Sequence, residues 1–173
     1  MKPVRLLLAT AITALSLNAH AVTAPTDGSW FDFDFDATGS ALYDLSTLDT
    51  NFTFTIAQAS VLRAVDLGFS GDRFEIFANG TSLGLTSFAP IAAGDEQQFD
   101  AATALSDGRW SNGSWNLAAG SYTITGVAHL SPFGGGYGQM SVTAVPEPES
   151  WAMLLAGLGM LGAIARRRMS RRA

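Results

Sequence analysis

The 173-residue sequence predicts an all-β fold, an antiparallel β-sandwich that we expect to be jelly-roll-like. Two observations lead to this class. Several short segments alternate apolar and polar residues, and this period of two places one face of a strand in a core. Turn-forming residues separate these segments at frequent intervals, and almost no internal stretch has the 3.6-residue period of a helix. The sandwich should be flanked by an N-terminal signal peptide and a single C-terminal transmembrane helix.

The strands are expected in the following order along the chain. Residues 30–36 alternate Phe with Asp, and residues 51–56 alternate Phe or Ile with Thr, so both read as half-buried strands. In the last strand, Met140, Val142 and Ala144 should share one face. Residues 93–107 are polar and rich in Ala, which predicts a long loop with one helical turn. The other strands are expected at 61–67, 73–78, 81–86, 110–117, 121–129 and 137–145.

A hairpin is expected where Asn79-Gly80 separates two alternating segments. A two-residue type I′ turn needs positive φ at both positions, and Asn-Gly adopts that conformation more readily than other pairs.

The N-terminus has the organisation of a secretory signal peptide. A basic start at 1–5 precedes an apolar run at 6–17, and Ala19-His20-Ala21 supplies a small-residue cleavage site. A first transmembrane helix is the alternative, which the short apolar run disfavours. Residues 1–21 are therefore set apart, and the ectodomain is expected at 22–144, the size of one domain.

The charge of this ectodomain is strongly negative. It holds 13 of the 15 acidic residues and 3 of the 10 basic residues, a formal charge of −10. Such a surface disfavours nucleic acid as a partner. The chain has no Cys, so disulfides and thiol chemistry are excluded, and the core must form by packing alone.

The C-terminal segment 145–173 combines three parts. Val145, Pro146, Glu147 and Pro148 keep the chain extended, because each proline restricts its own φ and the residue before it. The stretch from Trp151 to Ala165 has no charged residue and, as a helix, would be roughly 22 Å long, shorter than the bilayer core of about 30 Å. The basic tail at 166–172, which begins with Arg166, Arg167 and Arg168, should stay cytoplasmic.

These three parts, in this order and spacing, resemble the PEP-CTERM sorting signal of Gram-negative bacteria. The resemblance implies a precursor anchored in the inner membrane, with an exosortase as partner. This membrane protease would cut near Pro146-Glu147-Pro148 and release the ectodomain to the cell surface or the extracellular matrix. The motif residues would then be substrate residues.

Two groups of acidic residues invite a calcium interpretation. Asp32, Asp34 and Asp36 lack the Gly and Glu that a calcium loop of this spacing needs at its sixth and twelfth positions, so a solvated strand face is the better reading. Asp66, Asp72 and Glu75, around the loop at 68–71, form the second candidate calcium site. No other cofactor is expected.

Trp110 and Trp115, with Asn112 and Asn116 beside them, could stack on a sugar, which would make the ectodomain a carbohydrate-binding module acting on exopolysaccharide. Core packing is the better reading for both Trp side chains, because Trp usually buries most of its area.

No catalytic arrangement is visible. His129 is the single His beyond the signal peptide, and no G-x-S-x-G motif accompanies it. We therefore expect a surface or matrix protein that is not an enzyme.

Overall fold

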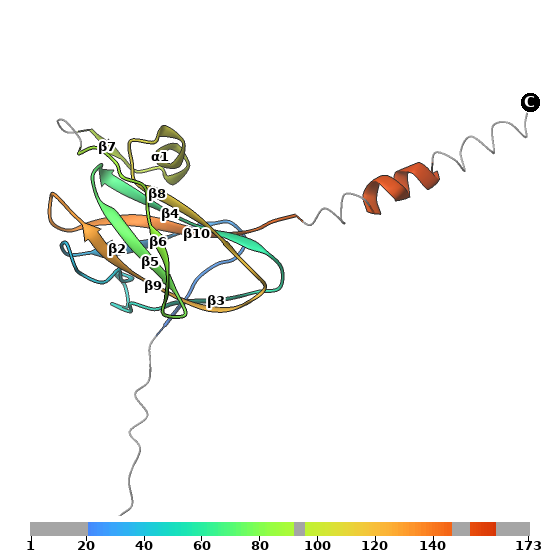
Figure 1. Ribbon diagram of the computed structural model, residues 1–173, viewed down its shortest axis with the longest axis horizontal. Helices are drawn as coiled ribbons and strands as arrows, with labels where there is room; N and C mark the ends of the chain where they lie inside the picture. Colours follow the sequence, from blue (N-terminus) through green and yellow to red (C-terminus); the bar gives the residue numbers. More distant parts are fainter. Residues whose placement is uncertain (1–20, 92–95, 147–152, 162–173) are drawn as a thin grey trace, which may run out of the picture.

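The computed structural model describes residues 21–91, 96–146 and 153–161, and in them two β-sheets lie face to face around an apolar core (Figure 1). The strands of sheet A, in spatial order, are β1 (Val22–Thr23), β3 (Phe52–Ile56), β9 (Gly120–Leu130), β5 (Arg73–Ala78) and β6 (Thr81–Leu85). The strands of sheet B are β2 (Trp30–Phe35), β10 (Gly136–Ala144), β4 (Ser60–Phe69) and β8 (Asn112–Leu117). A short strand, β7 (Gln97–Gln98), pairs with the end of β4.

The strand pairing is nested. β2 pairs with β10, β3 with β9, β4 with β8 and β5 with β6, so the first long strand meets the last and the innermost pair is a hairpin. All of these pairs are antiparallel, whereas β1 joins β3 in parallel. This is the connectivity of a long antiparallel ribbon rolled into two sheets, which is a jelly roll. The prediction of an antiparallel β-sandwich is confirmed.

Alternation along the strands builds the core. In β2, Phe33 and Phe35 are buried, while Asp32 and Asp34, which alternate with them, face away from the core. The rings of both Phe residues meet the edge of Phe74 in β5, with centroids 5.0 and 5.1 Å apart, so aromatic contacts join the two sheets. The largest fully buried side chains of this core are those of Phe33, Phe35, Leu42, Phe52, Leu62, Phe74, Ile76, Ile124 and Met140.

The predicted hairpin is present between β5 and β6. Asn79 and Gly80 have φ of 50° and 77°, as a type I′ turn requires. The Asn79 side chain also accepts a hydrogen bond from the amide of Thr123 at 2.8 Å and donates one to the carbonyl of Ser121 at 3.2 Å. The turn residue therefore ties the hairpin to β9.

A glycine lets β10 approach β2 closely. A methyl group on Gly138 would lie 2.4 Å from the Phe33 ring and 2.5 Å from the carbonyl oxygen of Val65. Gly138 stands opposite Phe33 on one side and opposite Asp66 on the other. Any side chain here would displace the core ring, so this position requires glycine.

A short helix packs against β4 on the outer face of sheet B, at one end of the sandwich. α1 (Ala101–Asp107) begins at its N-cap Asp100, whose carboxylate accepts from the amide of Thr103 at 2.8 Å, and ends at Gly108 with φ of 73°. It buries Ala101 and Ala104 in a second apolar cluster. The single helical turn expected within 93–107 is thus a seven-residue helix, lying beside β7 at one end of the sandwich.

The two ends of the chain are only partly described. The expected signal peptide at 1–21 lies almost wholly outside the described residues. Of the expected transmembrane helix at 151–165, residues 153–161 are helical, and its ends and the tail at 166–172 also fall outside them. Among the helices that the structure describes, none has the length and apolar character needed to cross a membrane.

Candidate functional site

The processing motif begins where the folded body ends. β10 stops at Ala144, which is exposed, whereas Met140 and Val142, expected on the same face of the strand, are buried. The reason is that the chain leaves the sandwich at this point. The amide of Val145 still donates to the carbonyl of Ala59 at 2.9 Å, whereas the Val145 side chain is 39% exposed. Pro146 is exposed, and Glu147 and Pro148 lie outside the described residues.

Two of the three residues of the candidate calcium site lie together, buried at one end of the sandwich. Asp66 belongs to β4, on the same inward face as Leu62 and Ala64, and is 0% exposed. Asp72 precedes β5 and is 4% exposed. Both carboxylate oxygens of Asp66 and the Oδ1 of Asp72 are buried and have no hydrogen-bond partner among the described residues.

The third residue, Glu75, points elsewhere. Its neighbours in β5, Phe74 and Ile76, face the core, so Glu75 faces outward. Its Oε1 accepts a hydrogen bond from the Ser82 hydroxyl on β6 at 2.7 Å. The structure therefore does not bring Glu75 to the buried pair, because side chains alternate along a strand.

Burial changes the acidity of both buried carboxyls. Desolvation, and then the charge of Asp72, raises the pKa of Asp66 to about 9. Three nearby backbone amides, of Leu67, Gly71 and Asp72, oppose this rise, but none donates a hydrogen bond in good geometry. Burial also raises the pKa of Asp72 to about 6, against a smaller opposing effect of Ser131. In the protein alone, the pair thus favours holding a proton at neutral pH.

Asp72 also lines a cavity of about 190 Å³ that opens to solvent. Aromatic rings dominate its walls, and the Phe69 and Phe133 rings have centroids 5.4 Å apart. The remaining lining residues are Leu67, Gly68, Gln97, Phe99, Gly135, Gly136 and Tyr137. The cavity could not be predicted from the sequence, since its walls come from three separate segments of the chain. The glycine run at 134–136, beside Phe133, was the available signal.

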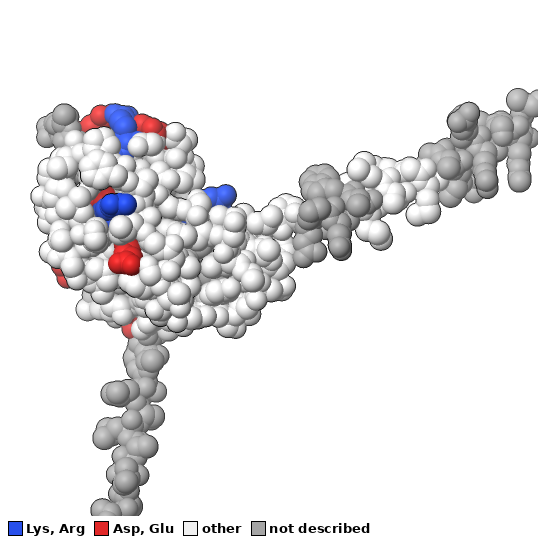
Figure 2. Space-filling view, viewed as in Figure 1, with Lys and Arg blue, Asp and Glu red and all other residues white. Residues whose placement is uncertain are grey.

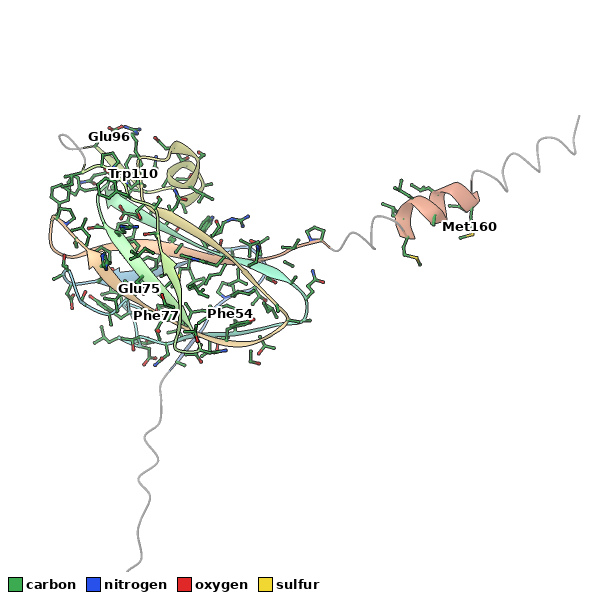
Figure 3. All side chains as sticks on the ribbon, viewed as in Figure 1. Phe54, Glu75, Phe77, Glu96, Trp110 and Met160 are labelled. Carbon is green, nitrogen blue, oxygen red and sulfur yellow. The ribbon has the colours of Figure 1, made fainter. Side chains whose placement is uncertain are left out.

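The two Trp residues of the expected sugar platform lie in different clusters. Trp110 is 2% exposed, belongs to the cluster under α1, and donates its indole N–H to the carbonyl of Gly68 at 2.9 Å. Trp115 is partly buried and packs against the main core. Figure 3 shows Trp110 at the end of the sandwich near β7, away from Phe54 and Glu75. The structure thus does not bring the two indoles together as an exposed platform.

A different surface gathers hydroxyl groups. Thr53 and Thr55 of β3 stand opposite Thr123 and Ser121 of β9, and the Thr55 and Ser121 hydroxyls are 2.9 Å apart. With Thr23 of β1, they line an open hollow of about 520 Å³ together with Phe54 and Tyr122. We call the group Thr23, Thr53, Thr55, Ser121 and Thr123 the hydroxyl face. It contains no charged residue.

Charged side chains are sparse over much of the ectodomain surface seen in Figure 2. The group of both signs at one end includes Glu96 (labelled in Figure 3), whose carboxylate pairs with Arg109 at 2.6 Å. Arg109 also contacts Asp107 at 2.7 Å. Within the described ranges, no group of three or more His, Cys, Asp or Glu side chains is arranged to hold a metal.

The comparisons with known proteins concern the tail and the fold. The model of the PEP-CTERM protein-sorting motif matches residues 144–171. No curated protein matches the chain. Among solved structures, the chain is similar to the pre-peptidase C-terminal domain of collagenase from Bacillus anthracis, with 14% identity and a TM-score of 0.40, over 71% of this chain and 94% of that domain.

The matched range begins at the last residue of β10 and includes all three parts of the C-terminal segment. The motif implies an exported protein that an exosortase processes. The chain is therefore a PEP-CTERM protein with a β-rich ectodomain.

Proposed function

We propose that the chain is a surface or extracellular-matrix protein whose ectodomain has no catalytic role. A C-terminal helix at 151–165 holds the exported precursor in the inner membrane for a short time. The exosortase then cuts near Val145–Pro148, and the ectodomain passes to the cell surface or into exopolysaccharide.

The position of the motif carries this proposal. The folded body closes with the Val145–Ala59 backbone hydrogen bond, and the next residue, Pro146, is exposed. A protease needs extended backbone that is free of sheet hydrogen bonds, and prolines keep a chain extended. A cut after Pro146 removes no residue of either sheet, so the ectodomain persists after its anchor is gone.

Mass spectrometry of the protein from culture medium and cell envelope tests the processing. We expect exported species that end near the motif and lack 151–173. Pro146→Ala with Pro148→Ala should lower the released fraction at least several-fold, whereas Pro90→Ala, an exposed proline in a loop of the ectodomain, should not. Exported wild-type protein that keeps Trp151 and the residues after it would contradict the proposal.

Binding of exopolysaccharide is the second candidate function, and the hydroxyl face supports it better than the two Trp residues do. Its side chains are uncharged hydrogen-bonding groups that cover a hollow wide enough for a sugar ring. A neutral polysaccharide could bind there without facing the negative charges of the rest of the ectodomain.

Glycan binding by three proteins tests this candidate. Thr53→Val with Thr123→Val removes two hydroxyls and keeps side-chain shape, and we expect it to weaken binding about tenfold or more. Trp115→Ala should leave binding unchanged. If Trp115→Ala alone abolishes binding, the site is the one expected from the sequence, and if the wild-type protein binds no glycan, this candidate is wrong.

A further inference from the structure

The buried carboxylates of Asp66 and Asp72 lack the partners that such groups normally have. Three of their oxygens are buried and accept no hydrogen bond from any described residue. An unpaired carboxylate in a protein interior is costly, and buried charges are nearly always paired or bound to a metal. A positive charge or a proton beside Asp66 and Asp72 would therefore offset the cost of burying the two carboxylates.

No arginine of the ectodomain supplies that charge. Arg73, which directly follows Asp72, donates its Nε–H to the carbonyl of Thr86 at 2.9 Å. Arg63 lies near Thr143, with its Nη1 3.4 Å from the hydroxyl oxygen. Both ion pairs of the described residues are made by Arg109, with Glu96 and Asp107. The ectodomain contains no lysine.

The surroundings of the pair are suited to a small cation. Asp72 lines the 190 Å³ cavity, so an ion has a route from solvent to the carboxylate of Asp72. Gly136 flanks this route, and a methyl group there would lie 3.3 Å from the Oδ2 of Asp72. The same methyl group would lie 2.9 Å from the Phe35 ring, so glycine lets the chain pass closely between this ring and the carboxylate. Asp66 itself is completely buried, which excludes a bulky organic cation from direct contact with it.

The available donors are oxygens. Calcium takes six to eight oxygen ligands from carboxylates, carbonyls and water in flexible geometry, whereas zinc prefers the nitrogen and sulfur donors that this site lacks. Two carboxylates also carry the charge that one divalent cation neutralises. We propose that Asp66 and Asp72 bind one calcium ion at this end of the sandwich, with backbone carbonyls and water completing its coordination.

A calcium ion at Asp66 and Asp72 would connect β4 with the start of β5, close to the start of β10. Asp66 lies on β4 in sheet B, Asp72 leads into β5 in sheet A, and Gly136 at the start of β10 lies beside Asp72. The ion would therefore link the two sheets at the end of the sandwich that the cavity opens. The proposal is independent of the processing and of the glycan site.

Equilibrium dialysis of the full-length chain in mild detergent against calcium tests the proposal. We expect one bound ion per chain with a Kd of about 10⁻⁴ to 10⁻³ M, the range of extracellular calcium modules. Asp66→Asn and Asp72→Asn should each weaken binding at least tenfold. Glu75→Gln is the matched control, because it removes an acid from the next strand without touching the pair, and it should bind as the wild type does.

Thermal unfolding of the wild-type chain gives a second measurement that needs no variant. With 10 mM calcium we expect a Tm about 5 °C or more above that in EDTA, and a smaller rise with magnesium. An equal Tm in calcium and EDTA, with no bound ion in dialysis, would mean that the carboxyls share a proton instead, and would overturn the proposal. Calcium binding that survives in both Asn variants would also overturn it.

Discussion

At the scale of single residues, the buried Asp66 gives the protein a distinctive dependence on pH when calcium is absent. Its pKa is about 9 in the folded chain, against an ordinary value of 3.8, so the folded state binds the proton more tightly than the unfolded state. This contribution to stability is complete below about pH 4 and is lost as the pH rises through about 9. Asp72 acts in the same direction up to about pH 6.

We therefore predict that, in EDTA, the free energy of unfolding falls as the pH rises from 4 to 9. Asp66→Asn, whose amide resembles the protonated acid, should remove most of this slope, and Glu75→Gln should keep it. Urea denaturation at several pH values, followed by circular dichroism, measures both. A wild-type free energy of unfolding that stays level or increases over this range would show that Asp66 is ionised in the folded state.

The burial of a side chain and its place in a site are hard to predict when they depend on residues far away in the sequence. The sequence placed Asp66, Asp72 and Glu75 in one site, but Glu75 stands on the other face of β5. The burial of Trp110 comes from α1, whose length was underestimated. Phe99 and Phe133 were missed because they are exposed loop residues, and only the folded chain brings them to Asp72.

At the scale of elements, the β5–β6 hairpin depends on one side chain. Asn79→Ala would remove two hydrogen bonds to β9 and would place alanine at a positive φ. We predict a loss of about 1–3 kcal/mol in the free energy of unfolding, measured by urea denaturation of the full-length chain. Asn116→Ala, an exposed position in β8, should change it by less than about 0.5 kcal/mol. Equal effects of the two substitutions would argue against this role of Asn79.

Local patterns predicted these elements well, for a physical reason. Period-two alternation encodes which face of β2 and β3 is buried, and Asn-Gly encodes the turn, so neither depends on distant residues. The ends of elements are different. Ala144 continues the alternation of β10 but is exposed, since the sequence does not reveal where the opposite sheet stops covering the strand.

At the scale of the whole molecule, the sandwich class followed from the number of alternating segments, whereas the pairing of strands did not. β2 and β10 are about a hundred residues apart, and no local pattern in either strand predicts that they pair. Contacts such as that between Gly138 and Phe33 select the pairing through shape, which becomes visible only when both strands are in place. The number of strands favours a jelly roll but does not give the order of its strands. The nested pairing of β2–β10, β3–β9, β4–β8 and β5–β6 gives that order.

The strand order of sheet B affects when the ectodomain can complete its fold. β10 lies between β2 and β4 as an inner strand of sheet B, and it is also the last strand in the part of the chain that the structure describes. A chain is made from its N-terminus, so sheet B cannot be completed until the segment directly before the sorting motif has emerged. The ectodomain can therefore complete sheet B only after residues 136–144, directly before the sorting motif, are present. A chain that ends before residue 136 would lack both this inner strand and the sorting motif.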